Sequence, residues 1–188
     1  IQDPGLKKSI QDDIVKIDQL ISQVLENYKI RSGGFQLIKT RIEVDKFIDL
    51  LLKNYAEIKP GIKFQRIPNI FCEFDSMMIE RVLTNIIDNA VKYSKPESEE
   101  ILITMEDFEN QIGITIQDRG VGISEQDLDR VFDPFYRGDK ARTPHSKSGF
   151  GLGLAITKSI LDQHNFKIKI TSEQGQGTRV ELLFKKSF

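Results

Sequence analysis

Asparagine and lysine side chains recur at helical spacing in the stretch RVLTNIIDNAVKYS, residues 81–94. Drawn as a helix, this stretch has a polar stripe made of Arg81, Asn85, Asp88, Asn89 and Lys92. Asparagine costs on the order of half a kcal/mol in a helix relative to alanine. Two asparagines one turn apart, followed by a lysine, indicate a face selected for amide oxygens and a cation. The alternative is the solvated face of an ordinary amphipathic helix.

Two glycine clusters supply backbone that a ligand can approach. The first, DRGVGI over residues 118–123, follows a predicted buried strand. It is either a plain turn or a site where a planar ligand reaches the backbone while Asp118 accepts a hydrogen bond from the ligand's amino group. The second, GFGLGL over residues 149–154, runs directly into a predicted helix, whose free N–H groups and dipole favour an anion. No Lys-Ser or Lys-Thr pair follows, so we predict a phosphate-binding loop other than a P-loop.

Two further motifs lie near these clusters. In FDPFYR, residues 132–137, Arg137 can add a cation to a phosphate site, and Phe132 and Phe135 are expected to anchor the loop. In GQGT, residues 175–178, Thr178 either presents its hydroxyl to a ligand or simply belongs to a hairpin turn.

The first 34 residues are predicted to form a helical unit of their own. Apolar residues recur at steps of four and three from Leu6 to about Arg31, a pattern typical of a helix that packs against another helix. The members of this seam are Leu6, Ile10, Ile14, Ile17, Ile21, Val24 and Tyr28. Ser32-Gly33-Gly34 ends the helix, so we place the domain boundary between residues 1–34 and 35–188.

Beyond this hinge, strand and helix patterns are mixed. We predict strands over 35–44, 62–67, 70–74, 101–105, 112–116, 167–172 and 178–184. We predict helices over 44–58, over 81–94 with an opening capped by Asp75, over 124–130 with Ser124 and Asp127 as a capping-box pair, and over 152–164. Residues 133–148 are polar and broken by prolines, which predicts a mobile loop. The pattern favours a layer of helices on one face of a mixed sheet.

Composition excludes several classes of protein. A formal net charge of −1 provides no basic field for nucleic acid. The single cysteine, Cys72, excludes an internal disulfide and favours a reducing compartment. No apolar run has the length of a membrane span, and the N-terminus lacks the features of a signal peptide. We therefore expect a cytoplasmic domain. Because residue 1 is Ile rather than Met, we expect a fragment whose parent can carry a membrane anchor.

Taken in order, the four motifs resemble those of the ATP-binding catalytic domain of sensor histidine kinases, within the superfamily shared with the Hsp90 chaperones, DNA gyrase and MutL. Residues 81–94 look like the N box, 118–123 the G1 box, 132–137 the F box and 149–154 the G2 box. The resemblance covers about residues 35–184. It implies a two-layer α/β sandwich that holds ATP between the N-box helix and a lid over about 138–148. The preceding helix resembles the second helix of the family's dimerisation and phosphoacceptor hairpin.

The resemblance also implies roles for particular residues. Asn89 would coordinate Mg²⁺, which prefers oxygen ligands. Asn85 and Lys92, with Tyr93 beside them, would line the phosphate side, and Asp118 would bind the adenine amino group. The other implied nucleotide contacts are Gly120, Gly122, Ile123, Tyr136, Arg137, Gly149, Gly151, Leu152, Gly153, Leu154 and Thr178. The residues implied in phosphoryl transfer are Asn85, Lys92 and Arg137.

Asn85 bears on the reaction. Superfamily members that hydrolyse ATP generally carry a glutamate at the matching position, and an amide cannot act as a general base. The resemblance therefore implies that the γ-phosphoryl group passes to a histidine on an adjoining helix, for relay to a response-regulator receiver domain. Neither His145 nor His164 fits the family's phosphoacceptor pattern. The acceptor helix is thus expected elsewhere in the same or the partner protomer of a homodimeric parent.

Two alternatives stay open. One is a nucleotide-gated binding module of the same superfamily without phosphotransfer. The other is a serine kinase of the anti-sigma type, which the heptad-bearing helix disfavours.

Overall fold

The computed structural model describes residues 36–138 and 150–187, together with some of the residues between Ile10 and Tyr28. The chain divides into two compact units, residues 1–36 and 37–188, close to the predicted glycine hinge. The described residues between Ile10 and Tyr28 are helical, and the seam side chains of Ile10, Ile14 and Ile17 are each more than half exposed. Leu6, Gly149 and residues 139–148 of the predicted lid, which include His145, lie outside the described residues.

A five-stranded mixed sheet forms the centre of the second unit, in the order β2-β4-β5-β7-β6. The strands are β2 (Ile62–Gln65), β4 (Ile101–Asp107), β5 (Gln111–Gln117), β7 (Gly177–Lys185) and β6 (Lys167–Glu173). The β2 strand runs parallel to β4, and the other three pairs are antiparallel. Ile103 lies opposite Ile116, and Ile114 lies opposite Leu182, so the apolar positions of neighbouring strands share one face.

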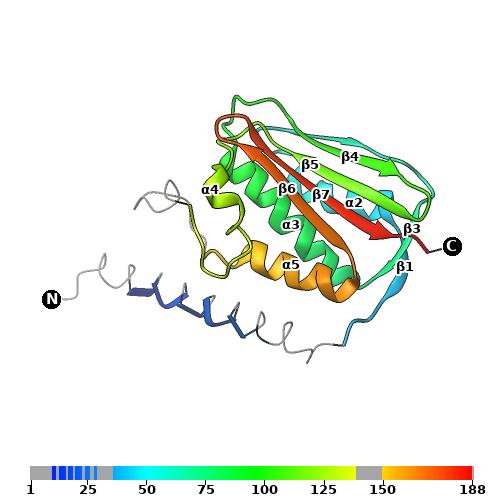
Figure 1. Ribbon diagram of the computed structural model, residues 1–188, viewed down its shortest axis with the longest axis horizontal. Coiled ribbons are helices and arrows are strands. Elements are labelled where there is room, and N and C mark those ends of the chain that lie inside the picture. The colour runs from blue at the N-terminus through cyan, green and yellow to red at the C-terminus, as the bar shows by residue number, and fades with distance from the viewer. Residues whose placement is uncertain are drawn as a thin grey trace. The chain divides into compact units, whose positions relative to one another are not determined.

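Three helices cover this apolar face: α2 (Val44–Leu52), α3 (Ser76–Tyr93) and α5 (Gly153–His164). In Figure 1 the strands β5, β7 and β6 cross in front of α3, with the helices behind the sheet. This is the two-layer α/β sandwich that the sequence predicted, with helices on one face of a mixed sheet. None of the helices in the described ranges has the length and hydropathy needed to cross a membrane.

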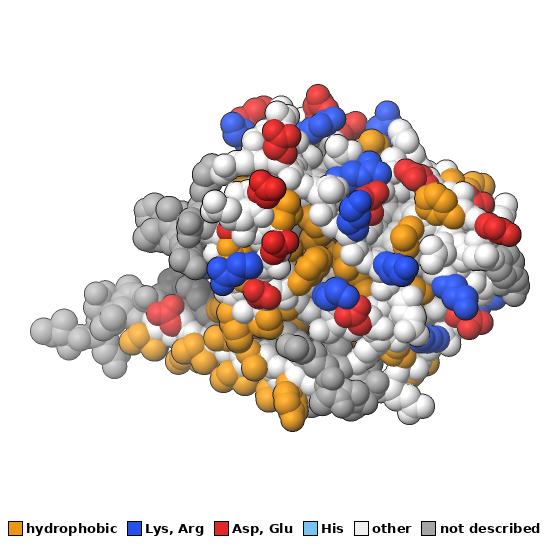
Figure 2. Space-filling model, in the orientation of Figure 1, with side chains coloured by type: hydrophobic (Ala, Val, Ile, Leu, Met, Phe, Trp, Pro, Cys, Tyr) orange, Lys and Arg blue, Asp and Glu red, His pale blue; other side chains and the backbone are white. Residues whose placement is uncertain are grey.

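The core lies between α3 and the sheet. The strand side chains Ile103, Ile114 and Ile116 are buried, and the apolar face of α3 meets them with Val82, Leu83, Ile86, Ile87 and Ala90. Full burial of such a side chain stabilises the fold by about 1.5–3 kcal/mol. Alternate strand positions point to the other face, which Figure 2 shows as a mosaic of Lys, Arg, Asp and Glu with some hydrophobic side chains.

Several predicted elements were wrong in length. A strand was predicted over 35–44, but β1 covers only Thr40–Glu43, because its partner β3 (Phe71–Phe74) offers four residues for pairing. These two strands form a separate two-stranded sheet. The helix predicted over 44–58 ends at Leu52 and continues as the short 3₁₀ helix η1 (Lys53–Tyr55).

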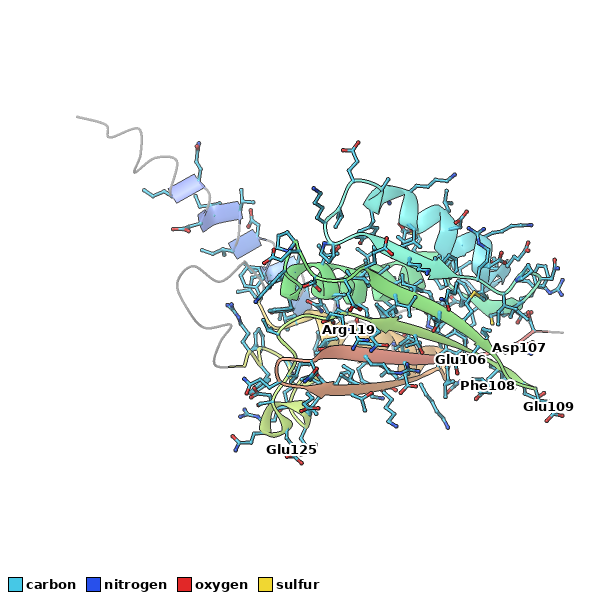
Figure 3. All side chains as sticks on the ribbon, turned by 90° about the horizontal axis from the view of Figure 1, so that it is seen from above. Glu106, Asp107, Phe108, Glu109, Arg119 and Glu125 are labelled. Carbon is cyan, nitrogen blue, oxygen red and sulfur yellow. The ribbon has the colours of Figure 1, made fainter. Side chains whose placement is uncertain are left out.

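The capping box predicted at Ser124 was also wrong in detail. Helix α4 (Glu125–Leu128) is a single turn, and Ser124 is its N-cap residue without a side-chain hydrogen bond to the backbone. The Ser124 hydroxyl instead donates to Oδ2 of Asp127 at 2.8 Å. Figure 3 shows Glu125 of α4 at one end of the domain, and Glu106 and Asp107 of β4 with Phe108 and Glu109 of the following turn at the other.

Candidate functional site

Helix α3 carries the N-box residues and begins as predicted. Asp75 is its N-cap residue, and Oδ1 of Asp75 accepts a hydrogen bond from the Met78 N–H at 3.2 Å. The other oxygen, Oδ2, accepts from the Ile38 N–H at 3.0 Å. The N-terminus of α3 is therefore tied to the segment by which the chain enters this unit.

The polar stripe of α3 divides into two parts with different neighbours. Asn85 Nδ2 donates to Thr157 Oγ1 of α5 at 2.9 Å. Asp88 accepts a hydrogen bond of 2.8 Å from the hydroxyl of Tyr55, at the end of η1. Burial and the contact with Asp88 raise the pKa of that tyrosine hydroxyl. Asp88 thus has a structural partner, whereas Asn85 joins the N box to the helix that follows the G2 box.

Asn89 has the chemistry of a metal ligand. Its side chain is half-buried, yet its amide makes no hydrogen bond within the described part of the chain. An amide oxygen without a protein partner suits Mg²⁺, which keeps several water ligands and shares the oxygens of a nucleotide phosphate. One turn further along, the Nζ atom of Lys92 lies 5.0 Å from the ring centroid of Tyr93. The donor set therefore fits a magnesium–phosphate group.

Asp118 joins the G1 box to the last predicted motif. Its Oδ1 accepts from the N–H groups of Gly120 at 2.7 Å and Thr178 at 3.2 Å, and its own N–H donates to the Thr178 carbonyl at 2.9 Å. Its Oδ2 accepts no hydrogen bond from the described residues. Burial raises the pKa of this carboxyl, although the two backbone donors oppose that shift. A carboxylate oxygen of a largely buried residue, without a donor among the described residues, fits a ligand amino group.

The G1 glycines lie where the backbone of other segments of the protein approaches too closely for a side chain. A Cβ atom on Gly120 would lie 2.4 Å from the Tyr93 carbonyl oxygen, and one on Gly122 would lie 2.0 Å from that of Glu173. Gly122 also has a φ of +66°, which residues with a side chain rarely adopt. These contacts correspond to the turn interpretation of the motif, and they place Ile123 beside the hairpin that carries Thr178.

The G2 segment opens α5 and contacts two other motifs. Gly151 has a φ of +72°, and its carbonyl accepts from the Phe135 N–H of the F box at 2.9 Å. A Cβ atom on Gly153 would lie 2.2 Å from Asn85 Oδ1. Leu152 is the N-cap residue of α5, is 2% exposed and cannot cap the helix through its side chain. Among the described residues, the N-cap side chain therefore leaves the first N–H groups of α5 without a hydrogen bond, which suits an anion-binding helix start.

The F box is held through Tyr136, while Phe132 is half-buried and Phe135 is exposed. The Tyr136 hydroxyl donates to Oδ1 of Asp127, and the guanidinium carbon of Arg130 lies 4.2 Å from the Tyr136 ring centroid. The prediction that Phe135 anchors the loop was wrong, because its side chain is 58% exposed. Phe135 has a φ of +66°, and its backbone makes the contact with the G2 segment.

His164, predicted to end α5, has a structural role. It is buried; Nδ1 contacts the Ile160 carbonyl at 2.8 Å, and Nε2 accepts from the Asp75 N–H at 3.1 Å. This arrangement requires the neutral ring with its proton on Nδ1. Burial accordingly lowers the pKa of His164. The C-cap itself is Asn165, in the left-handed conformation.

Three residues to which the sequence assigned no role in the site support the predicted ones. Thr157 contacts Asn85, Asp127 contacts Tyr136, and Ser172 contacts Thr178. The one available signal was helical spacing, since Thr157 lies one turn after Gly153 in α5. A cavity of about 380 Å³ lies elsewhere, lined by Lys63, Gln65, Glu99, Glu100, Leu102, Gln117 and Arg119. Of these residues only Arg119 lies in a predicted motif, the G1 box, and it is not one of the implied nucleotide contacts.

Comparison with known proteins decides the family. The family described as histidine kinase-, DNA gyrase B- and HSP90-like ATPase matches residues 74–187, which include α3, the G1 segment and α5. The chain belongs to this ATPase family. ATP is therefore the nucleotide that membership implies for the site.

Curated relatives and solved structures agree with this assignment. Over 181 residues the chain is 34% identical to the sensor protein kinase WalK of Staphylococcus epidermidis, and 35% identical to that of Staphylococcus aureus strain Newman. Each alignment covers 94% of this chain, which spans about 30% of the relatives' length.

Solved structures share the ATPase fold at lower identity. The mycobacterial sensor histidine kinase MprB matches 79% of this chain and 98% of its own, with a TM-score of 0.66 at 23% identity. Full-length ShkA in complex with AMPPNP matches 96% of this chain and 38% of its own, with a TM-score of 0.76 at 18% identity.

Proposed function

We propose that this chain is the catalytic part of a sensor histidine kinase, which binds Mg-ATP and transfers the γ-phosphoryl group to a histidine. The contact from Asn85 to Thr157 carries this proposal, because it brings the N box against the helix that the G2 glycines open. The relatives named as sensor protein kinases and the ShkA structure with AMPPNP support it.

In this proposal the two ends of the nucleotide meet different elements. Asp118, Gly120, Gly122, Ile123 and Thr178 form the adenine site, where the free carboxylate oxygen of Asp118 accepts from the amino group. Asn85, Lys92, Tyr93, Tyr136, Arg137 and the G2 residues from Gly149 to Leu154 line the phosphates. Asn89 holds Mg²⁺, whose charge neutralises that of the phosphate oxygens.

The transfer step needs a nucleophile from outside the site. An imidazole nitrogen forms a bond to the γ-phosphorus, the bond from that phosphorus to the bridging oxygen breaks, and ADP leaves. Asn85 offers an amide and therefore cannot deprotonate water, which keeps hydrolysis slow. We infer that the acceptor histidine lies on an adjoining helix of the same or the partner protomer, and that a receiver-domain aspartate takes the phosphoryl group.

Calorimetric titration with a non-hydrolysable ATP analogue tests the nucleotide part of this proposal. Wild-type protein should bind the analogue in a Mg²⁺-dependent manner. Asn89→Ala should bind it at least about tenfold more weakly in the presence of Mg²⁺. Asn54→Ala, at an exposed position of η1, is the matched control and should bind as wild type does. Equal affinities for Asn89→Ala and wild type with Mg²⁺ would contradict the metal assignment.

Product analysis tests the transfer itself. The full-length parent should take up a labelled γ-phosphoryl group from ATP. Because phosphohistidine is labile in acid, this label should be lost on acid treatment. Acid-stable label would instead support the serine-kinase alternative. Binding of the analogue without any labelling would support the module that only binds nucleotide.

A further inference from the structure

Ser172 of β6 contacts three groups around the proposed adenine site, although no motif in the sequence indicates it. Its Oγ donates to the Gly177 carbonyl at 2.7 Å and accepts from the Ile123 N–H at 2.8 Å. It also lies 3.0 Å from Oγ1 of Thr178. The side chain is half-buried and joins the loop after β5 to the turn between β6 and β7.

The number of donor hydrogens and acceptor lone pairs on these groups determines which partner donates in each hydrogen bond. A hydroxyl has a single hydrogen and two lone pairs, and a carbonyl oxygen can only accept. The Ser172 hydrogen is therefore committed to the Gly177 carbonyl. Its oxygen must then accept from both Ile123 and Thr178, so the Thr178 hydroxyl donates to Ser172. The oxygen of Thr178 retains only lone pairs for a ligand.

Asp118, like the Thr178 oxygen, offers a ligand only hydrogen-bond acceptors. The backbone of Thr178 is bonded to Asp118 in both directions, at 3.2 Å from the Thr178 N–H to Oδ1 and at 2.9 Å from the Asp118 N–H to the Thr178 carbonyl. The ionised carboxylate of Asp118 can only accept, and its Oδ2 has no donor among the described residues. The two neighbouring side chains therefore both offer acceptors to a base.

We propose that Ser172 determines the base specificity of this site by keeping the Thr178 hydroxyl in its acceptor state. Two acceptors favour a purine with an amino group at position 6, as in adenine. They disfavour a carbonyl at that position, as in hypoxanthine or guanine, because O6 is itself an acceptor and supplies none of the hydrogens that the amino group gives to the two facing oxygens. Ser172 acts through Thr178 and is a positioning residue. The inference rests on the proposed function, since it requires a purine nucleotide at Asp118.

Affinities for ATP and ITP, which differ at position 6 of the purine, test the proposal on the whole chain with Mg²⁺. In Ser172→Ala the Thr178 hydroxyl is free to rotate and donate. The ratio of the ITP dissociation constant to the ATP dissociation constant should then fall about five- to tenfold relative to wild type. Ser172→Thr keeps a hydroxyl at the position and should retain the wild-type ratio.

Thr178→Val provides a second and independent measurement. It removes the acceptor directly and should lower the same ratio, and adding Ser172→Ala to it should lower the ratio no further. A purely structural role for Ser172 would weaken both nucleotides equally, so an unchanged ratio in Ser172→Ala overturns the proposal. If Ser172→Ala does not fold, an unchanged ratio in Thr178→Val overturns it as well. Wild-type protein that binds neither nucleotide would instead overturn the proposed function.

Discussion

At the scale of single residues, the site depends on polar atoms that the protein itself leaves without partners. Asn89 is half-buried and Asp118 is buried, and neither the Asn89 amide nor Oδ2 of Asp118 has a hydrogen bond to the residues that the structure describes. Buried polar groups normally find partners, because an unpaired one costs about 1–3 kcal/mol. Such groups are therefore natural positions for a ligand to contact.

Asp118→Asn should separate stability from binding. Asparagine keeps the oxygen that accepts from Gly120 and Thr178, but it presents a donor where Asp118 has its free oxygen. The raised pKa of Asp118 means that folded protein holds the proton to higher pH than the unfolded chain does, whose value is 3.8. Ionisation of this group therefore lowers stability as pH rises from 3.8 through the folded-state value.

The expected result for Asp118→Asn at pH 7 is an unchanged or higher melting temperature with ATP affinity reduced more than about tenfold. Thermal melts and calorimetry measure the two quantities. Asp129→Asn, at an exposed position after α4, is the control and should change neither. A lower melting temperature together with wild-type affinity would contradict the assignment of Asp118.

Gly153→Ala should disturb the position of Asn85. The new Cβ would lie 2.2 Å from Asn85 Oδ1, so the amide must move away from its contact with Thr157. Alanine is favoured over glycine in a helix by about 1 kcal/mol, which offsets part of the cost to folding. We expect weaker nucleotide binding with a modest change in melting temperature. Gly61→Ala is the control, because its Cβ would approach only the flexible end of Glu100.

At the scale of elements, α3 and α5 are joined at both ends of their contact. Asn85 and Thr157 join them near the start of α5, and His164 joins the end of α5 to the Asp75 N–H at the start of α3. The packing of these two helices therefore sets the distance between Asn89 on α3 and the first N–H groups of α5. The ionisation of His164 should affect this packing.

His164→Gln should flatten the pH dependence of stability. Burial lowers the pKa of His164 from its ordinary value of 6.5, with Lys39 lowering it further and Asp75 opposing the shift. The unfolded chain therefore binds the proton more readily, and wild-type stability should fall as pH drops below 6.5 through the folded-state value. Glutamine can accept the Asp75 hydrogen bond and does not titrate.

Urea denaturation between pH 5 and pH 7.5 measures this difference. His145 is present in both proteins, so the difference in slope isolates His164. Equal slopes for the variant and wild type would show that His164 does not titrate with folding.

At the scale of the whole chain, the two units differ in how much apolar surface they bury. Every buried core residue in the described part lies between Val44 and Phe184, within the second unit. In the first unit most of the described apolar side chains, such as Ile10 and Ile14, are exposed. We therefore expect residues 37–188 alone to fold, with the melting temperature and nucleotide affinity of the full chain. Circular dichroism and calorimetry on this shorter chain provide the check, and loss of cooperative unfolding would contradict it.

Local patterns in the sequence determined much of this protein. The 3.6-residue period and the Asp75 cap predicted α3, and alternation of isoleucines predicted β4 and β5. The order of four motifs predicted the family and the two-layer fold. These features depend on neighbours within about one or two turns, which is why sequence analysis can find them. The predicted length of an element was wrong where strand pairing sets that length, as in β1, which pairs with β3.

Only the tertiary structure decided which predicted residues have partners. It brought Asn85 to Thr157 across 72 positions and Ser172 to Ile123 across 49, and no local pattern relates residues so far apart. It also divided the polar stripe, since Asp88 contacts Tyr55 whereas Asn85 contacts α5. The physical reason is that helix and sheet packing is set by burial summed over the whole core. Which polar groups then meet is a consequence of that packing.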